Sequence, residues 1–101
     1  MQDYEKAIFR AALSKYGITN QKIVAIEECA ELIKALCKSL RGFADLNNIA
    51  EEMADVSIML DQMSIVFQNS DLVRSHRNKK VVRLKSRIGK GVDKHGNPNA
   101  N

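Results

Sequence analysis

The sequence predicts an all-α protein built from four long helices. Its only proline is Pro98, and only Gly17 and Gly42 precede residue 89 among its five glycines, so few residues interrupt a helix in the first 88. Apolar residues recur three and four positions apart through this stretch, as they do on one face of a helix. With 101 residues, 45% of them hydrophobic, the chain is too apolar for disorder and too short for two cores. We therefore expect one helical domain over residues 1–88.

The first helix is expected from about Asp3 to Tyr16. Asp3 is a candidate N-cap, and Gly17 is placed to end the helix in a conformation that other residues avoid. One side of this helix is apolar, and it consists of Ala7, Ile8, Ala11 and Ala12.

The second helix is expected to begin near Thr19 or Asn20 and to end at Arg41, before a glycine. Cys29 and Cys37 lie eight residues apart on it, a separation of roughly 12 Å that no disulfide spans. We expect both to be small buried thiols without a chemical role. The main apolar stripe of this helix consists of Ile23, Ile26, Cys29, Ala30, Ile33, Leu36, Cys37 and Leu40.

The third helix is expected from about Asn47 to Gln68, and the fourth from an N-cap at Asp71 to Ile88. The third has apolar residues on nearly all sides, which is typical of the centre of a bundle. Its main stripe consists of Ile49, Met53, Val56, Leu60, Met63 and Phe67. Residues 89–101 contain few apolar side chains, and we expect them to form a flexible tail.

Charge and hydropathy exclude several classes of protein. No apolar run approaches the roughly 18 residues of a membrane span. The first ten residues carry two acids and lack the apolar core of a secretory signal, which predicts a cytoplasmic protein. Residues 1–70 hold seven basic and ten acidic side chains, whereas residues 71–101 hold nine and two. A small domain of this kind leaves much apolar surface to bury, so we expect it to form oligomers.

Two short acidic motifs contain the densest group of carboxylates. Glu28 and Glu31 lie three residues apart on the second helix, and Glu52 and Asp55 lie three residues apart on the third, so each pair shares one side of its helix. Both pairs have apolar neighbours, and a carboxylate at the edge of a core costs several kcal/mol unless it is paired, protonated or bound to metal. Because all four candidate ligands are oxygens, we expect Mg²⁺, with Mn²⁺ as a substitute.

The alternative is that these acids pair with lysines along their own helix or compensate helix dipoles. Glu51 and Glu52 lie in the first turn of the third helix, where an acid is favoured without any ligand. For Glu27 and Glu51, this structural interpretation and a functional one stay open.

The acidic motifs resemble a known family signature. Glu27-Glu28-Cys29-Ala30-Glu31, followed after twenty residues by Glu52-Met53-Ala54-Asp55, is similar to the EExxE…ExxD signature of the MazG-like all-α nucleoside triphosphate pyrophosphohydrolases. The longer segment QKIVAIEECAELIKALCKSLRG resembles the small single-domain, often phage-encoded members.

This resemblance implies a Mg²⁺-dependent enzyme that cleaves a nucleoside triphosphate to the monophosphate and pyrophosphate. It also implies a four-helix MazG-like bundle assembled as a homodimer or homotetramer. By motif position, Glu28, Glu31, Glu52 and Asp55 would be the metal ligands, and Glu27 a further ligand or a base that orients water.

The fourth helix carries a basic stripe that could bind phosphate. Lys80, Arg83 and Arg87 follow His76 at helical spacing, and a triphosphate needs such cations beyond the metal. A solvated basic face, or a non-enzymatic module that binds nucleic acid through residues 74–94, is the alternative. The absence of a helix-turn-helix pattern and the few aromatics argue against nucleic acid.

Gln21 could line a nucleobase pocket, although packing or capping would also explain it. The sequence assigns no preferred nucleotide, metal number, attacked phosphorus, choice between dimer and tetramer, or physiological role.

Overall fold

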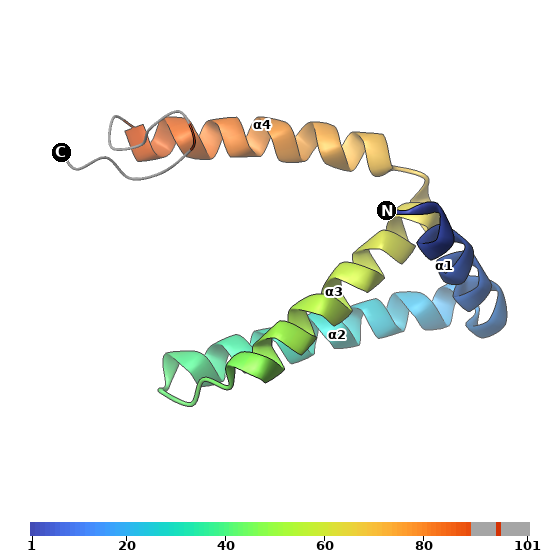
Figure 1. Ribbon diagram of the computed structural model, residues 1–101, viewed down its shortest axis with the longest axis horizontal. Coiled ribbons are helices and arrows are strands. Elements are labelled where there is room, and N and C mark those ends of the chain that lie inside the picture. The colour runs from blue at the N-terminus through green and yellow to red at the C-terminus, as the bar shows by residue number, and fades with distance from the viewer. Residues whose placement is uncertain (90–94, 96–101) are drawn as a thin grey trace. The chain divides into compact units, whose positions relative to one another are not determined.

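The computed structural model describes residues 1–89 and residue 95, and all regular structure in this part is helical (Figure 1). The four helices are α1 (Asp3–Tyr16), α2 (Ile18–Leu40), α3 (Leu46–Phe67) and α4 (Ser70–Ile88). The predicted all-α fold with four helices is confirmed, with helix ends within two residues of those expected. The tail expected over 89–101 falls almost wholly outside the described residues.

The chain divides into two compact units, Met1–Gln68 and Asn69–Asn101. The first contains α1, α2 and α3, and the second contains α4. Whether residues 1–88 act as one MazG-like domain stays a prediction. None of the described helices is long and apolar enough to cross a membrane.

The first helix begins with a capping box. Its N-cap is Gln2, not Asp3 as predicted, because the carboxylate of Glu5 accepts a hydrogen bond from the backbone N–H of Gln2 at 3.0 Å. At the other end, the backbone N–H of Gly17 donates to the carbonyl of Leu13 at 3.0 Å. With φ of +89°, Gly17 turns the chain directly from α1 into α2.

Side chains and left-handed residues set the remaining boundaries. Asp45 caps α3, since its carboxylate accepts from the backbone N–H of Asn48 at 3.0 Å. Gln68, with φ of +51°, ends α3 in the left-handed conformation. Asn69 precedes α4, so Asp71 lies in the first turn of that helix rather than at its predicted N-cap position, where it forms an exposed ion pair with Arg74.

Within the first unit, α2 and α3 pack side by side as an antiparallel pair, and α1 contacts both (Figure 1). The buried apolar residues are Phe9 on α1, Ala35 on α2 and Met59 on α3. Two amides are equally buried: Gln21 Nε2 donates to Gln62 Oε1 at 2.7 Å, from α2 to α3.

The contact between α2 and α3 has a seven-residue repeat. On α2 the positions 21, 28 and 35 follow one another at this spacing, and on α3 the positions 48, 55 and 62 do the same. Because the helices are antiparallel, Gln21 meets Gln62, as its hydrogen bond shows. The same register brings Glu28 to Asp55. A seven-residue repeat keeps one side of a helix facing its partner over several turns.

The main apolar stripe of α2 is exposed, contrary to the burial expected for its cysteines. Ile26 is 70% exposed and Ile33 62% exposed, and the free thiols Cys29 and Cys37 are also at the surface. The reason is that α2 contacts α3 through the side that carries Gln21 and Glu28, whose polar character hides it from a search for apolar periodicity.

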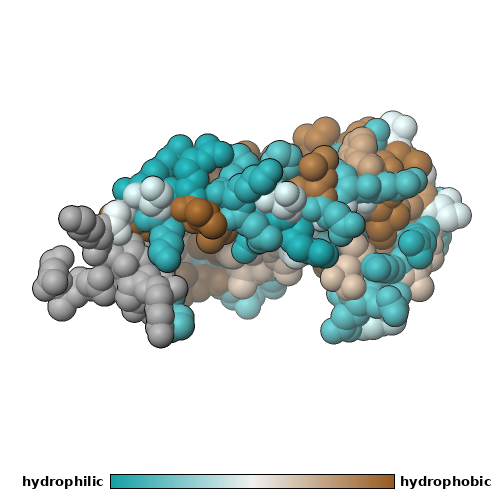
Figure 2. Space-filling view, turned by 90° about the horizontal axis from the view of Figure 1, so that it is seen from above, coloured by the Kyte–Doolittle hydropathy of each residue, from teal (hydrophilic) through white to brown (hydrophobic). Residues whose placement is uncertain are grey.

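Two further faces differ from the sequence prediction. On α1, Phe9 is buried while Ile8 of the predicted apolar side is exposed. On α3, Met53, Leu60 and Phe67 are each more than half exposed, so within one chain this helix is not covered on all sides. Hydrophobic residues therefore form part of the molecular surface (Figure 2). The fourth helix has no buried residue among those described.

Candidate metal centre

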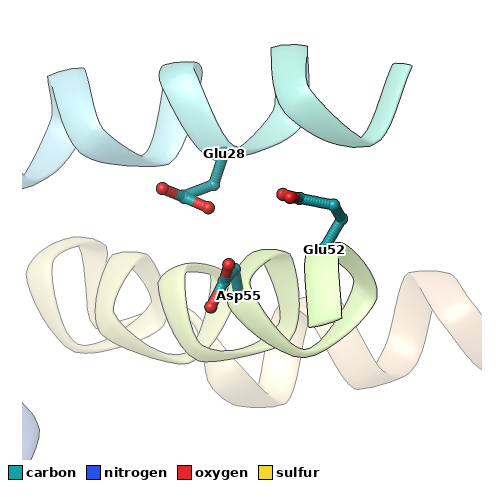
Figure 3. A group of neighbouring side chains, drawn as sticks. All are labelled: Glu28, Glu52 and Asp55. Carbon is teal, nitrogen blue, oxygen red and sulfur yellow. The ribbon is translucent and has the colours of Figure 1, made fainter. Parts of the chain in front are cut away.

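Three carboxylates meet where α2 and α3 pack together. Each of Glu28, Glu52 and Asp55 offers an oxygen that lies within 4.8 Å of those of the other two. Glu28 extends from α2, and the two acids of α3 point toward it between the helices (Figure 3). Glu28 and Glu52 are partly buried, and Asp55 is exposed.

The helical spacing explains why these three meet. Glu28 lies seven residues after Gln21, so the α2 side that is fixed by the buried amide pair also carries this carboxylate. Glu52 and Asp55 lie three residues apart, nearly one turn, and therefore project toward α2 together.

The carboxylates repel one another in the absence of a cation. Partial burial raises the pKa of Glu28, and the charge of Asp55, a side-chain hydrogen bond with Asp55, and the charges of Glu52 and Glu31 raise this pKa further. Among the described residues, no lysine or arginine forms an ion pair with any of these acids. A bound cation would relieve the repulsion that the protein itself leaves uncompensated.

The structure brings three of the four predicted ligands together. Glu31 is exposed and lies outside the three-carboxylate group, although it is near enough for its charge to raise the pKa of Glu28. Glu27 is exposed and also lies outside the group. Glu51 is exposed and accepts a hydrogen bond from Asn47 Nδ2 at 3.1 Å, which fits a structural role in the first turns of α3.

Carboxylate oxygens are the ligands that hard divalent cations prefer in proteins. Three of them from two helices could hold a metal ion such as Mg²⁺ and leave further coordination positions for water or phosphate oxygens.

The predicted substrate-binding residues lie in different places. Gln21 is buried, and its amide donates to Gln62, so it forms part of the helix contact. Lys80, Arg83 and Arg87 are exposed on α4, in the second compact unit. Lys80 borders an exposed side of that helix together with Val81 and Leu84. Their role toward a substrate stays a prediction.

A cavity at the end of the α2–α3 pair was not predicted. It measures about 550 Å³, and Lys38, Arg41, Phe43 and Asn48 are among the residues that line it. A helical wheel could not predict it, because a wheel does not show where the loop after α2 turns back. The sequence feature that could have indicated this cavity is Phe43, an aromatic residue directly after Gly42 at the end of α2.

Comparison of the chain with family models, curated proteins and solved structures finds no match. The function proposed below therefore depends on the carboxylate geometry and on the motif resemblance.

Proposed function

We propose that this chain is a Mg²⁺-dependent nucleoside triphosphate pyrophosphohydrolase, which releases a nucleoside monophosphate and pyrophosphate. The observation that supports this most directly is the approach of Glu28, Glu52 and Asp55 to within 4.8 Å. These acids belong to the two motifs whose order and spacing resemble the MazG-like signature. We place the reaction in the cytoplasm.

In this proposal, Glu28, Glu52 and Asp55 bind the metal, and Glu31 is the fourth ligand. Bound there, Mg²⁺ would polarise a phosphoryl group and lower the pKa of a coordinated water. Glu27, the residue before Glu28, is a further ligand or a base that orients the attacking water, as the resemblance implies. No residue has to form a covalent bond to phosphorus, since positioning and charge stabilisation are the main requirements of phosphoryl transfer.

The basic residues of α4 are the candidates for contact with the phosphates of the substrate. Lys80, Arg83 and Arg87 supply cations for the phosphate oxygens, and Lys80 and Arg83 stabilise charge on the leaving pyrophosphate. Gln21, the candidate for a nucleobase pocket, takes no part in this proposal, because its buried amide donates to Gln62 across the α2–α3 contact.

We also propose that the active form is a homodimer or homotetramer. Support comes from the exposed apolar stripe of α2, on which Ile26, Ile33 and Leu36 are all close to half exposed or more. Met53 and Leu60 of α3 are exposed as well. Contiguous apolar surface of this kind is typical of subunit interfaces.

A turnover assay tests the proposed reaction. The purified protein is incubated with a panel of canonical and modified ribo- and deoxyribonucleoside triphosphates, with Mg²⁺, with Mn²⁺ or with a chelator. We expect monophosphate and pyrophosphate, in equal amounts and only with metal. Release of orthophosphate, or no turnover of any substrate, would overturn the proposal. Salt-dependent binding of nucleic acid without turnover would instead favour the basic-module alternative.

A further inference from the structure

The cavity at the end of the α2–α3 pair has the size and lining of a small-molecule site. Its volume of about 550 Å³ lies within the range of roughly 300–1,000 Å³ that is typical of ligand pockets. Lys38 and Arg41 line it from the last turn and the C-cap of α2, and Phe43 lines it from the following loop. Two cations and one aromatic ring, all exposed to solvent, therefore line one open hollow.

The two cations are available for a ligand. Within the part of the chain that the structure describes, neither Lys38 nor Arg41 forms an ion pair. Asp45, which also lines the cavity, accepts a hydrogen bond from the backbone N–H of Asn48 at 3.0 Å and so holds the start of α3. The N-terminal end of α3 brings partial positive charge to this place and the C-terminal end of α2 partial negative charge, so the side-chain cations decide the sign of the local potential. An arginine and a lysine together favour phosphate oxygens.

The cavity and the carboxylate group lie on the same two helices, within one compact unit. Ala35, on its α2 wall, lies seven residues after Glu28, and Asn48, on its α3 wall, lies four residues before Glu52. Four residues correspond to roughly 6 Å along a helix axis. Lys38 and Arg41 themselves follow Glu28 by ten and thirteen residues, roughly 15 and 20 Å along α2, so the anion that reaches from these cations toward a cation held by the three acids is an extended polyphosphate.

We propose that Lys38 and Arg41 form a polyphosphate-binding subsite, which holds the far phosphate oxygens of an extended ligand at the loop end of the helix pair that carries the metal centre. This inference rests on the proposed function, because that function identifies the natural ligand as a nucleoside triphosphate. It places phosphate-binding cations on the same pair of helices as the carboxylates, in addition to those proposed on α4. Without metal the nearby carboxylates repel the anion, so binding strengthens when Mg²⁺ is present.

Isothermal titration with inorganic pyrophosphate, with and without Mg²⁺, tests the subsite. The variant Lys38→Gln/Arg41→Gln is compared with a control, Arg10→Gln/Lys34→Gln, which removes the same charge from exposed positions outside the cavity. We expect affinity to fall by about tenfold for each cavity cation removed. In the control it should stay within about twofold. Lys38→Arg should retain most of the affinity, and circular dichroism verifies that each variant is helical.

Equal loss of affinity in both double variants, or no pyrophosphate binding by the wild-type protein, overturns the subsite. Nucleoside triphosphates form a second arm. If their affinity falls by the same factor as that of pyrophosphate, the subsite holds the phosphates of a nucleotide; if only pyrophosphate is affected, it holds the free anion.

Turnover separates the two proposals. If Lys38→Gln/Arg41→Gln keeps both wild-type turnover and wild-type pyrophosphate affinity while Asp55→Asn loses turnover, the subsite is wrong and the proposed function stands. If no protein turns over any substrate but pyrophosphate binding still depends on Lys38 and Arg41, the proposed function fails and the subsite stands.

Discussion

Replacement of Glu28 by glutamine should stabilise the metal-free protein. The oxygens of Glu28, Glu52 and Asp55 lie within 4.8 Å, where two unit charges repel by about 0.9 kcal/mol even in the dielectric of water. Salt at about 0.1 M reduces this to roughly 0.5 kcal/mol per pair. Glu28 takes part in two such pairs, so glutamine, which can still hydrogen-bond to Asp55, should raise the free energy of unfolding by about 1 kcal/mol.

Thermal unfolding followed by circular dichroism measures this effect. A change of 1 kcal/mol shifts the Tm of a domain this small by about 4–8 °C. The scan is made with a chelator at a pH above the raised pKa of Glu28, so that the wild-type carboxylate is ionised. A second scan contains Mg²⁺ at about 100 times its Kd, which should stabilise the wild-type protein by about 2.7 kcal/mol. The glutamine variant should gain far less.

Glu27→Gln is the matched control. Glu27 is the adjacent residue, it is exposed, and it lies outside the three-carboxylate group, so the same change of charge there should shift the Tm little. A lower Tm for Glu28→Gln, or an equal rise for Glu27→Gln, would refute the repulsion inferred from the geometry. Equal protection of both variants by Mg²⁺ would show that the ion binds elsewhere.

Asp55→Asn should abolish turnover and weaken Mg²⁺ binding in calorimetry while leaving the helical signal unchanged; full activity would contradict its role as a ligand. Because the pKa of Glu28 is raised, the folded protein keeps this proton at pH values above 4.5, where the unfolded chain has lost it. Without metal, the free energy of unfolding should therefore fall as the pH rises from 4.5 through the raised pKa, and then level off. Denaturant titrations that show a rise over this pH range would refute the prediction. Ile33→Asp should shift the protein toward monomer in light scattering, and Lys34→Gln should not; an unchanged mass for the first variant would exclude this part of α2 from an interface. Gln62→Ala leaves a buried amide without its partner and should cost about 1–3 kcal/mol in urea denaturation; a neutral result would show that water replaces the bond.

The positions of the helices could be predicted from the sequence because their ends depend on local chemistry. Gly17 acts within a few residues of itself, and so does the cap at Asp45, which was not predicted but lies only two residues before the expected start of α3. The faces of the helices could not be predicted equally well. The α2–α3 contact carries Gln21 and Glu28, so apolar periodicity pointed to the stripe around Ile26, which the single chain leaves exposed.

The acidic motifs predicted most of the candidate site, because residues three apart on a helix share one side whatever packs against them. Glu28, Glu52 and Asp55 were expected to converge, and they do. The position of Glu31 outside the group could not be predicted, because it depends on the rotation of α2 about its own axis. The cavity near Lys38 was missed for a related reason, since it forms only when the loop brings the start of α3 back beside α2.

The hydrogen bond between Gln21 and Gln62 fixes the register of α2 against α3, and with it the alignment of the carboxylates. Each of these amides lies seven residues from one of the acids, Gln21 from Glu28 and Gln62 from Asp55. Sliding one helix by a single turn would break the amide bond and separate the two acids in the same movement. Folding and ion capture therefore share one mechanical requirement, and a substitution that lets the helices slip should impair both in proportion, even though it touches no ligand.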